Sequence, residues 1–407
     1  MEFTTSNRPS SRIPYRARII LRMLEQLRHG SLRLFLPDGQ VRNFGVGDEP
    51  HAPAAPISLT LNSWTPFLAA LKSGDIGFAE SFIDNHWHTD NLPGLLELLA
   101  RNRQQIESAL YGSWLGRLAY RIKHWRNRNT RAGSRKNISA HYDLGNNFYW
   151  LWLDPSMSYS AAIFSGKDDQ TLEQAQYAKY RRVLQQLQVK QGSRVLEIGC
   201  GWGGFAETAI REGGVSLTGL TLSEQQLRYA QKRLQEAGLD GRGNLQLCDY
   251  RDVDEPYDAI ASIEMFEAVG EEYWDSYFAC LNRNLRQGGR ACIQSIVIDD
   301  ALFETYRKGT DFIQQYVFPG GMLPSREVFC KLAQKHGLHV ADIFPFGLDY
   351  AETLAIWRRQ FRAQLREVRV QGFDERFIRT WDFYLAYCEA GFRAGNINVM
   401  QFTLIRN

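Results

Sequence analysis

The fold is decided by the stretch VLEIGCGWGG, residues 195–204. An apolar strand pattern at 195–198 ends in a turn that contains four glycines, and a helical pattern follows directly. Because glycine carries no side chain, a ligand can lie against the backbone of such a turn, and the N-terminus of the next helix favours electron-rich groups. The spacing is neither the dinucleotide fingerprint G-x-G-x-x-G nor a P-loop, which requires Gly-Lys followed by Ser or Thr. The stretch predicts a strand–loop–helix unit that binds a ligand, with a tight ligand-free turn as the alternative.

Around this stretch, strand and helix patterns alternate from residue 137 to residue 407. The strand patterns lie at 194–198, 215–221, 244–249, 257–263, 289–298 and 399–405, and the helical patterns at 203–213, 223–237, 272–286, 325–336, 351–368 and 374–393. Such alternation is typical of an α/β protein with a doubly wound, mostly parallel sheet, which binds its ligands at the carboxyl edge of the strands.

The patterns divide the chain into four segments. We expect a basic N-terminal arm (1–30), a small α+β domain (31–105), a basic aromatic linker (106–136) and the large α/β domain (137–407). In the small domain, strand patterns lie at 31–36 and 58–61, helical patterns at 65–73 and 92–101, and Pro37-Asp38-Gly39 is a hairpin turn signal.

The composition is that of an ordinary globular protein, with 44% hydrophobic residues and a net charge of +3. No apolar run is long enough for a transmembrane helix, and the N-terminus lacks the apolar core of a signal peptide. The six cysteines form no C-x-x-C pair, which indicates reduced thiols in a cytoplasmic protein. The eight histidines show no zinc spacing, so we expect no metal site.

Positive charge gathers in one segment, because no Asp or Glu occurs between Ser108 and Tyr142. The segment contains Arg117, Arg121, Lys123, Arg126, Arg128, Arg131, Arg135 and Lys136, with Trp114, Tyr120 and Trp125 among them. Basic residues mixed with large apolar ones suit an anionic membrane surface. A solvated linker, or a helix packed on its own domain, is an equally good interpretation. Nucleic acid is a weaker one, because the overall charge is nearly balanced and no binding motif is present.

Polar residues follow two further strands. Thr221 ends the strand at 215–221, where many nucleotide-binding units carry an acid for the ribose, and Gln226 lies one helical turn on. Both can hydrogen-bond a sugar, although Ser223 as a helix N-cap with Gln226 in a capping box fits as well. Asp249 and Tyr250 follow the next strand and can hold an adenine amino group and ring, with core packing as the alternative for Tyr250.

Nine sequence blocks, taken in order, resemble the cyclopropane-fatty-acid synthase family and the related mycolic acid cyclopropane synthases. The blocks are HYDLGN, LDPSMSYS, VLEIGCGWGG, GLTLS, DYRD, MFEAVG, FPGGMLPS, FGLDYAETLAIW and GFRAGNI, between residues 141 and 397. The resemblance implies a seven-stranded Rossmann-like methyltransferase sheet. It also implies an S-adenosylmethionine (SAM)-dependent C-methyltransferase that acts on double bonds of unsaturated acyl chains in membrane phospholipids.

The resemblance also assigns residues. SAM contacts fall on Tyr159, Ser160, Gly199, Gly201, Thr221, Gln226 and Tyr250, with Asp249 beside them. The family's active site binds a bicarbonate that acts as general base, and the matching groups here are Glu267, the backbone of Ile296, and Tyr350. The polar segment 141–162 precedes the first strand and is expected to be a lid over the cofactor.

This chain departs from the family near the expected bicarbonate. Alanine at 161 replaces a cysteine, Ala268 and Gln294 replace histidines, and Glu264 stands where glycine is usual. These changes leave the SAM residues intact. Gln294 can still donate a hydrogen bond, and Glu264 adds negative charge that opposes a bound anion if it faces the site. The substitutions therefore bear on the bicarbonate and on the product.

Several functions stay open at this level. Cyclopropane formation is the default, and a relative that makes methyl- or methylene-branched acids, including furan precursors, with a redox partner enzyme is the alternative. An alternative from another functional class is a lipid-binding protein without catalysis. A small-molecule methyltransferase is a further alternative, but it would not need the basic aromatic segment. We expect a cytoplasmic protein at the membrane periphery; a homodimer stays open.

Overall fold

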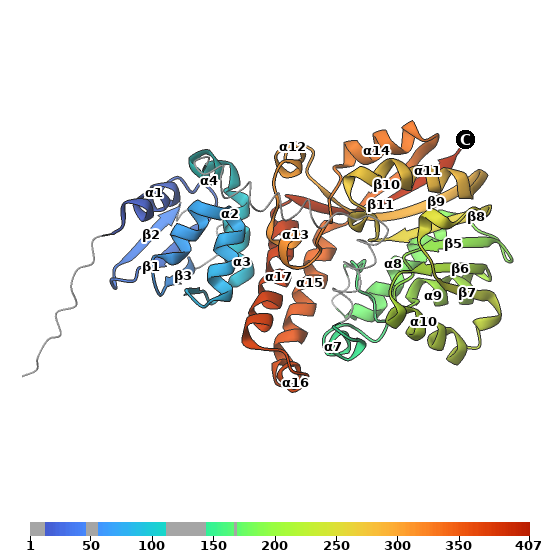
Figure 1. Ribbon diagram of the computed structural model, residues 1–407, viewed down its shortest axis with the longest axis horizontal. Helices are drawn as coiled ribbons and strands as arrows, with labels where there is room; N and C mark the ends of the chain where they lie inside the picture. Colours follow the sequence, from blue (N-terminus) through green and yellow to red (C-terminus); the bar gives the residue numbers. More distant parts are fainter. Residues whose placement is uncertain (1–12, 46–55, 111–143, 167–168) are drawn as a thin grey trace, which may run out of the picture. The chain divides into compact units, whose positions relative to one another are not determined.

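The computed structural model describes residues 13–45, 56–110, 144–166 and 169–407 of the chain, which forms two compact units, residues 1–119 and 120–407 (Figure 1). The boundary falls inside the predicted linker, and most of that linker lies outside the described residues. Each unit has its own sheet. The finer division into four segments stays a prediction.

The smaller unit is built on a four-stranded sheet of order β2-β1-β3-β4. Its strands are β1 (Ser31–Phe35), β2 (Val41–Gly45), β3 (Ile57–Leu61) and β4 (Trp87–His88), and its helices are α1 (Tyr15–Leu24), α2 (Thr65–Ile83), α3 (Leu92–Arg101) and α4 (Arg103–Leu110). The predicted hairpin forms, because β1 and β2 pair antiparallel across the turn at Pro37–Gly39. The helical pattern at 65–73 extends to Ile83 past a break at Gly74, whose φ is +62°.

The larger unit contains a seven-stranded sheet of order β10-β11-β9-β8-β5-β6-β7. The strands are β5 (Arg194–Ile198), β6 (Ser216–Thr221), β7 (Gly243–Leu247), β8 (Tyr257–Ile263), β9 (Leu285–Ile298), β10 (Leu338–Pro345) and β11 (Ile397–Arg406). Strands β5 to β9 are parallel, and β11 pairs antiparallel with both β9 and β10. The predicted doubly wound, mostly parallel, seven-stranded sheet is confirmed.

Helices connect and flank these strands (Figure 1). They are α7 (Asn146–Trp150), α8 (Leu172–Leu187), α9 (Gly204–Gly213), α10 (Glu224–Glu236), α11 (Trp274–Asn284), α12 (Phe303–Arg307), α13 (Phe312–Tyr316), α14 (Arg326–Lys335), α15 (Gly347–Ala363), α16 (Leu365–Val370) and α17 (Glu375–Arg393). The sequence patterns missed α8 and β10 and placed the start of β9 four residues late, at 289 instead of Leu285. No helix among the described residues is long and apolar enough to cross a bilayer.

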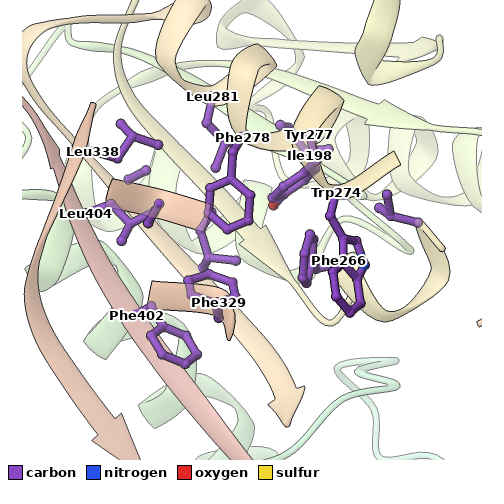
Figure 2. Close-up of a cluster of buried hydrophobic side chains, with 14 of the residues drawn as sticks. Ile198, Phe266, Trp274, Tyr277, Phe278, Leu281, Phe329, Leu338, Phe402 and Leu404 are labelled. Atoms are coloured by element: carbon purple, nitrogen blue, oxygen red, sulfur yellow. The ribbon is translucent and has the colours of Figure 1, made fainter. Parts of the chain in front are cut away.

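Two cores cover the two faces of the large sheet, because strand side chains alternate between faces. On β5, Leu196 and Ile198 join a cluster with α11 and α14, while Val195 joins a second cluster with α8, α9 and α10. Figure 2 shows the first cluster, in which Phe278 of α11 lies beside Phe329 of α14. Both faces are buried, which leaves the carboxyl edge of the parallel strands as the place for a site.

Candidate active site

Three residues expected to bind a cofactor, together with Glu264, lie at the carboxyl ends of neighbouring strands. Gly199 follows β5, Thr221 ends β6, Asp249 lies two residues after β7, and Glu264 follows β8. Since these four strands are adjacent and parallel, their carboxyl ends meet at one edge of the sheet. The fold therefore brings the predicted residues together.

The glycine turn leaves its backbone open. Gly199, Gly201 and Gly203 have φ values of +86°, +51° and +82°, in the left-handed region that favours glycine. A Cβ added at Gly201 would meet no atom within 4 Å, whereas one at Gly199 would lie 3.0 Å from the Met265 side chain. Helix α9 begins at Gly204, directly after the turn. The open space beside Gly201, next to a helix N-terminus, fits a cofactor that lies along the backbone.

Glu197 lies on β5, two residues before this turn. Its side chain is buried, and one carboxyl oxygen has no hydrogen-bond partner among the described residues. Burial raises the pKa of Glu197 to about 8, and the charge of Lys179 opposes that rise. An unpaired buried carboxyl oxygen has an unfavourable free energy, so it favours a polar or cationic group beside it.

Thr221 and Gln226 are buried and joined to each other. The Thr221 hydroxyl donates to Oε1 of Gln226 at 3.0 Å. Ser223 is the N-cap of α10, as one interpretation of the sequence had it, and its side chain accepts from the Gln226 backbone N–H. The expected capping box does not form, because the Ser223 N–H donates to the Thr221 hydroxyl. Because the Gln226 side chain bonds to Thr221, the two form a fixed polar pair at the end of β6.

The Asp249 carboxylate forms an ion pair with Arg251. One oxygen accepts from the Arg251 Nε at 2.9 Å and the other from Nη2 at 2.6 Å. The Tyr250 ring packs against Tyr277 at 5.6 Å between centroids and keeps part of its surface accessible. Tyr250 is thus available as a flat apolar surface, while Asp249 acts with Arg251 as an ion pair.

The segment around Tyr159 and Ser160 packs on the same edge. Tyr159 shares a hydroxyl–hydroxyl hydrogen bond of 2.7 Å with Tyr384 of α17. The Ser160 hydroxyl accepts from Lys179 at 2.5 Å, and the Ala161 N–H donates to Glu264 at 2.7 Å. The two predicted SAM residues are therefore held beside the end of β8. The lid role of this segment stays a prediction, and residues 141–143 lie outside the described residues.

Large aromatic side chains from this segment, α15 and α17 form what we call the aromatic cluster. Its members are Phe148, Tyr149, Trp152, Tyr159, Trp357 and Trp381. Ring centroids in the cluster lie 5.4 Å apart for Trp152 and Tyr159 and 5.7 Å apart for Trp152 and Trp357. Packing of this kind makes a rigid apolar wall beside the polar residues.

Glu267 and Ile296, two of the predicted catalytic positions, contact each other. Oε1 of Glu267 accepts a short hydrogen bond from the Ile296 N–H, and Oε2 is buried without a partner among the described residues. Burial, together with the charge of Glu264, raises the pKa of Glu267 to about 8. The protonated form therefore predominates at neutral pH, which fits a carboxyl group with a single donor.

Glu264 is the centre of the polar site. Its Oε1 accepts from the Ala161 N–H and from the Gln294 Nε2, both at 2.7 Å, and its Oε2 accepts from the Tyr350 hydroxyl at 2.7 Å. Burial raises the pKa of Glu264, while the bond from Tyr350 and the charge of Lys179 lower it. Two further predicted catalytic residues, Gln294 and Tyr350, are thus brought together by a residue that the family pattern does not contain.

Lys179 is a candidate that the sequence patterns missed. It lies on α8 and is fully buried. Burial lowers the pKa of its ammonium group to about 7, and the charges of Glu264, Asp154 and Glu197 oppose that fall. Its place on the stripe 172, 176, 179, 183, 187 would have identified it as facing the core. Groups of three or more metal-ligating side chains are absent from the described part of the chain.

Comparisons with known proteins point in one direction. The family model described as mycolic acid cyclopropane synthetase matches residues 129–402. Tuberculostearic acid methyltransferase UfaA1 of Mycobacterium tuberculosis is 38% identical over 387 residues, which cover 93% of this chain and 88% of the relative. The cyclopropane-fatty-acyl-phospholipid synthase of Escherichia coli is 36% identical over 355 residues, 87% of this chain and 89% of the relative.

A solved structure adds a bound cofactor product. The mycolic acid cyclopropane synthase CmaA1 complexed with SAH and CTAB has a TM-score of 0.63 and 33% identity, and the match covers 66% of this chain and 97% of that one. The match therefore takes in nearly all of that protein but only two thirds of this one.

Proposed function

This chain belongs to the mycolic acid cyclopropane synthetase family and is a SAM-dependent methyltransferase of the cyclopropane synthase type, and from that premise we propose its substrate. The substrate is the double bond of an unsaturated acyl chain in a membrane phospholipid. The enzyme adds one carbon from SAM to that bond and, by default, closes a cyclopropane ring.

The extent of the similarity carries this choice of substrate. The 355 residues aligned with the phospholipid enzyme exceed the length of the larger unit, residues 120–407, so the alignment takes in part of the smaller unit. The mycolic acid enzyme CmaA1, by contrast, covers 66% of this chain. The additional unit is thus a feature that this chain has in common with a protein named for acting on phospholipids.

The residues for SAM are those at the carboxyl edge. The open space beside the Gly201 backbone, in the turn that begins at Gly199, supports binding of the amino acid part of the cofactor, and the pair Thr221 and Gln226 supports binding of the ribose. Tyr250 offers a face for the adenine, and Asp249 fixes Arg251 beside it. Tyr159 and Ser160 close the other side of the site, where Lys179 holds the serine.

SAM supplies an electrophilic methyl group, and its transfer to one alkene carbon leaves a positive charge on the other. An isolated alkene is a weak nucleophile, so the chain must hold it in line and exclude water. The aromatic cluster supports that role, because its Tyr159 ring lies 5.4 Å from both the Trp152 and the Trp357 rings, between centroids. Glu267, Gln294, Tyr350 and the Ile296 backbone are the polar groups that we assign to the step after methyl transfer.

A second candidate product is a methyl or methylene branch. The relative that covers 93% of this chain is named a tuberculostearic acid methyltransferase and not a cyclopropane synthase. This chain also lacks the cysteine and histidine of the family pattern at 161 and 294. Both observations favour a product in which the positively charged acyl chain, formed by methyl transfer, becomes a branched chain and not a cyclopropane.

A peripheral position on an anionic membrane completes the proposal. This part of the proposal rests on the basic aromatic segment, residues 108–142. Its support comes from the sequence alone, since residues 111–143 lie outside the described residues. Positive charge near an anionic bilayer and inserted aromatic rings would bring the acyl chain to the enzyme.

The substrate proposal is tested by expressing the protein in bacteria that lack their own cyclopropane synthase and analysing the lipids by mass spectrometry. We expect phospholipid acyl chains heavier by one CH2, with the original double bond lost. Double-bond derivatisation labels a branched alkene but not a ring, and a saturated methyl branch is heavier than a ring by one H2, which separates the products. Unmodified phospholipids together with modified free acids or other lipids would contradict the proposed substrate.

A further inference from the structure

We propose that Glu264 occupies the place of the bicarbonate and is itself the base that removes the proton after methyl transfer. This inference rests on the proposed function for its chemistry. The structural part of the inference, that the Glu264 carboxylate fills the anion site, does not depend on the proposed function.

The donors expected for an anion are already used by this chain. The Ala161 N–H, Gln294 and Tyr350 all donate to Glu264, and the Ile296 N–H donates to Glu267. A bicarbonate at these groups would have to displace a carboxylate that makes three hydrogen bonds of 2.7 Å. The site therefore does not fit bicarbonate.

A chain of hydrogen bonds fixes which end of Gln294 faces Glu264. Arg182 donates to Oε1 of Gln401 at 2.6 Å, the Gln401 Nε2 donates to Oε1 of Gln294 at 3.0 Å, and the Gln294 Nε2 donates to Glu264. Because a guanidinium can only donate, the direction of the whole chain is set. Glu264 must accept at its end, which favours its ionised form.

The backbone at Glu264 supports a special role. Its φ is +50°, one of four non-glycine residues with positive φ among the described residues. A glutamate in this conformation is strained, and such strain persists where the surrounding structure demands it, often at active sites. The left-handed turn directs the residue to the carboxyl edge, and Glu264 keeps part of its surface accessible while Gln294 is fully buried.

The two neighbouring carboxyl groups have different environments, which divides their roles. Three hydrogen bonds of 2.7 Å stabilise the ionised form of Glu264, whereas Glu267 accepts a short hydrogen bond from the Ile296 N–H and has one oxygen without a partner among the described residues. Burial raises the pKa of both groups; the charge of Glu264 raises that of Glu267 further, whereas the hydrogen bonds from Tyr350 and Ala161 and the charge of Lys179 oppose the rise at Glu264. A pair of carboxyl groups separated in this way supplies one base and one acid.

The proposed step balances without a further reactant. A C–H bond of the added methyl group breaks, its proton forms an O–H bond with Glu264, and the electron pair closes the third bond of the ring. If the proton comes from another carbon next to the charge, the same pair forms a branched alkene. Neither outcome requires an oxidant or a reductant.

Two variants of Glu264 test the proposal. Glu264→Gln keeps the size of the side chain and removes the base, so we expect kcat to fall by about 100- to 10,000-fold with SAM affinity unchanged. Glu264→Gly relieves the left-handed backbone and opens the anion site. It should be inactive in carbonate-depleted buffer and regain turnover when bicarbonate is added, whereas the parent should not respond. Glu255→Gln, an exposed carboxylate before the other end of β8, is the matched control.

A binding measurement separates this inference from the proposed function. Titration of 13C-labelled bicarbonate, followed by NMR line broadening, should show binding to Glu264→Gly and none to the parent, whether or not a lipid is methylated. If the parent modifies no lipid, the proposed function fails. The titration then decides by itself whether Glu264 or bicarbonate occupies the anion site. Bicarbonate binding or strong stimulation in the parent, near-parental turnover of Glu264→Gln, or a folded Glu264→Gly that bicarbonate neither binds nor rescues would overturn the proposal.

Discussion

Among single residues, Gly201 gives the most direct test of the SAM site. Valine at this position would project into the open space beside the turn, so Gly201→Val should abolish SAM binding while the protein stays folded. The left-handed φ adds about 1–2 kcal/mol of strain. Gly192→Val is the matched control, because Gly192 also has a positive φ and open space but precedes β5 at its amino end. Calorimetry that finds parental SAM affinity in Gly201→Val would refute the placement of the cofactor.

Glu267 should make the stability of the protein depend on pH. Its pKa is raised to about 8 in the folded state, so the folded protein holds the proton more tightly than the unfolded chain, whose ordinary value is 4.5. The stabilising effect is full below pH 4.5 and is lost as the pH rises through about 8. Glutamine cannot ionise, so Glu267→Gln should gain on the order of 2–4 kcal/mol relative to the parent between pH 4.5 and pH 9.

Urea unfolding of both proteins at the two pH values measures this difference. Glu255→Gln, whose partner Arg194 is exposed, should change the free energy of unfolding by under about 0.5 kcal/mol. The same Glu267→Gln variant should lose most of its turnover, because it replaces the carboxyl group that bonds to the Ile296 N–H in the candidate site. An equal stability difference at both pH values would show that Glu267 is not held protonated by the fold.

The sequence revealed the candidate catalytic residues only in part. It identified Glu264 as unusual, and it placed Glu267, Gln294 and Tyr350 near one another. It could not show that Glu264 accepts from Ala161, Gln294 and Tyr350, because that depends on a left-handed turn and on β11 bringing Gln401 beside β9. Asp249 looked like an adenine ligand, and only the structure shows its ion pair with Arg251.

At the scale of elements, Arg233 of α10 connects helix α9 with the segment at Ser156 that precedes Tyr159 and Ser160. Its guanidinium donates to Glu207 of α9 at 2.6 Å and to the backbone oxygen of Ser156 at 2.7 Å. The two side chains are only 12% and 16% exposed, so removing Arg233 leaves the poorly solvated Glu207 carboxylate with Arg211 as its remaining cationic partner. Arg233→Gln should lower the free energy of unfolding by about 2–3 kcal/mol and weaken SAM binding.

A second arginine on the same helix provides the control. Arg228 pairs with Glu224, but both side chains are mostly exposed, so Arg228→Gln should cost under about 1 kcal/mol. Chemical denaturation and SAM titration of both variants decide the matter. Equal effects of the two substitutions would mean that the bonds from Arg233 do not hold the segment at Ser156.

The elements that the sequence missed have physical reasons. Helix α8 carries Gln176 and Lys179 on its buried face, which interrupts the apolar stripe, although Thr171 and Gln174 form a capping box that marks its start. Strand β10 is an edge strand with polar residues and a terminal proline, so its alternation is weak. The parallel strands β5, β6 and β8 were correctly predicted because their apolar runs lie between clear turn signals.

At the scale of the whole molecule, the basic segment should govern attachment to membranes. Replacing Arg117, Arg121, Lys123 and Arg126 by glutamine should weaken binding to anionic vesicles by roughly 1 kcal/mol per charge, and high salt should have the same effect on the parent. A control that removes the same number of charges replaces Arg181, Arg211, Arg228 and Lys232, which lie exposed on the larger unit. Vesicle sedimentation at low salt in which both variants bind alike would exclude a special role for the segment.

The aromatic cluster has a consequence for how inactive variants can be judged. Rings held in fixed, asymmetric surroundings give a near-ultraviolet circular dichroism spectrum, which disappears when side-chain packing loosens even if the helices remain. The cluster joins Trp152 of the segment before α8 to Trp357 of α15 and Trp381 of α17, all buried. A variant that is inactive yet keeps the parental spectrum has lost chemistry, and one that loses the spectrum has lost the packing of its buried aromatic side chains, the aromatic cluster among them.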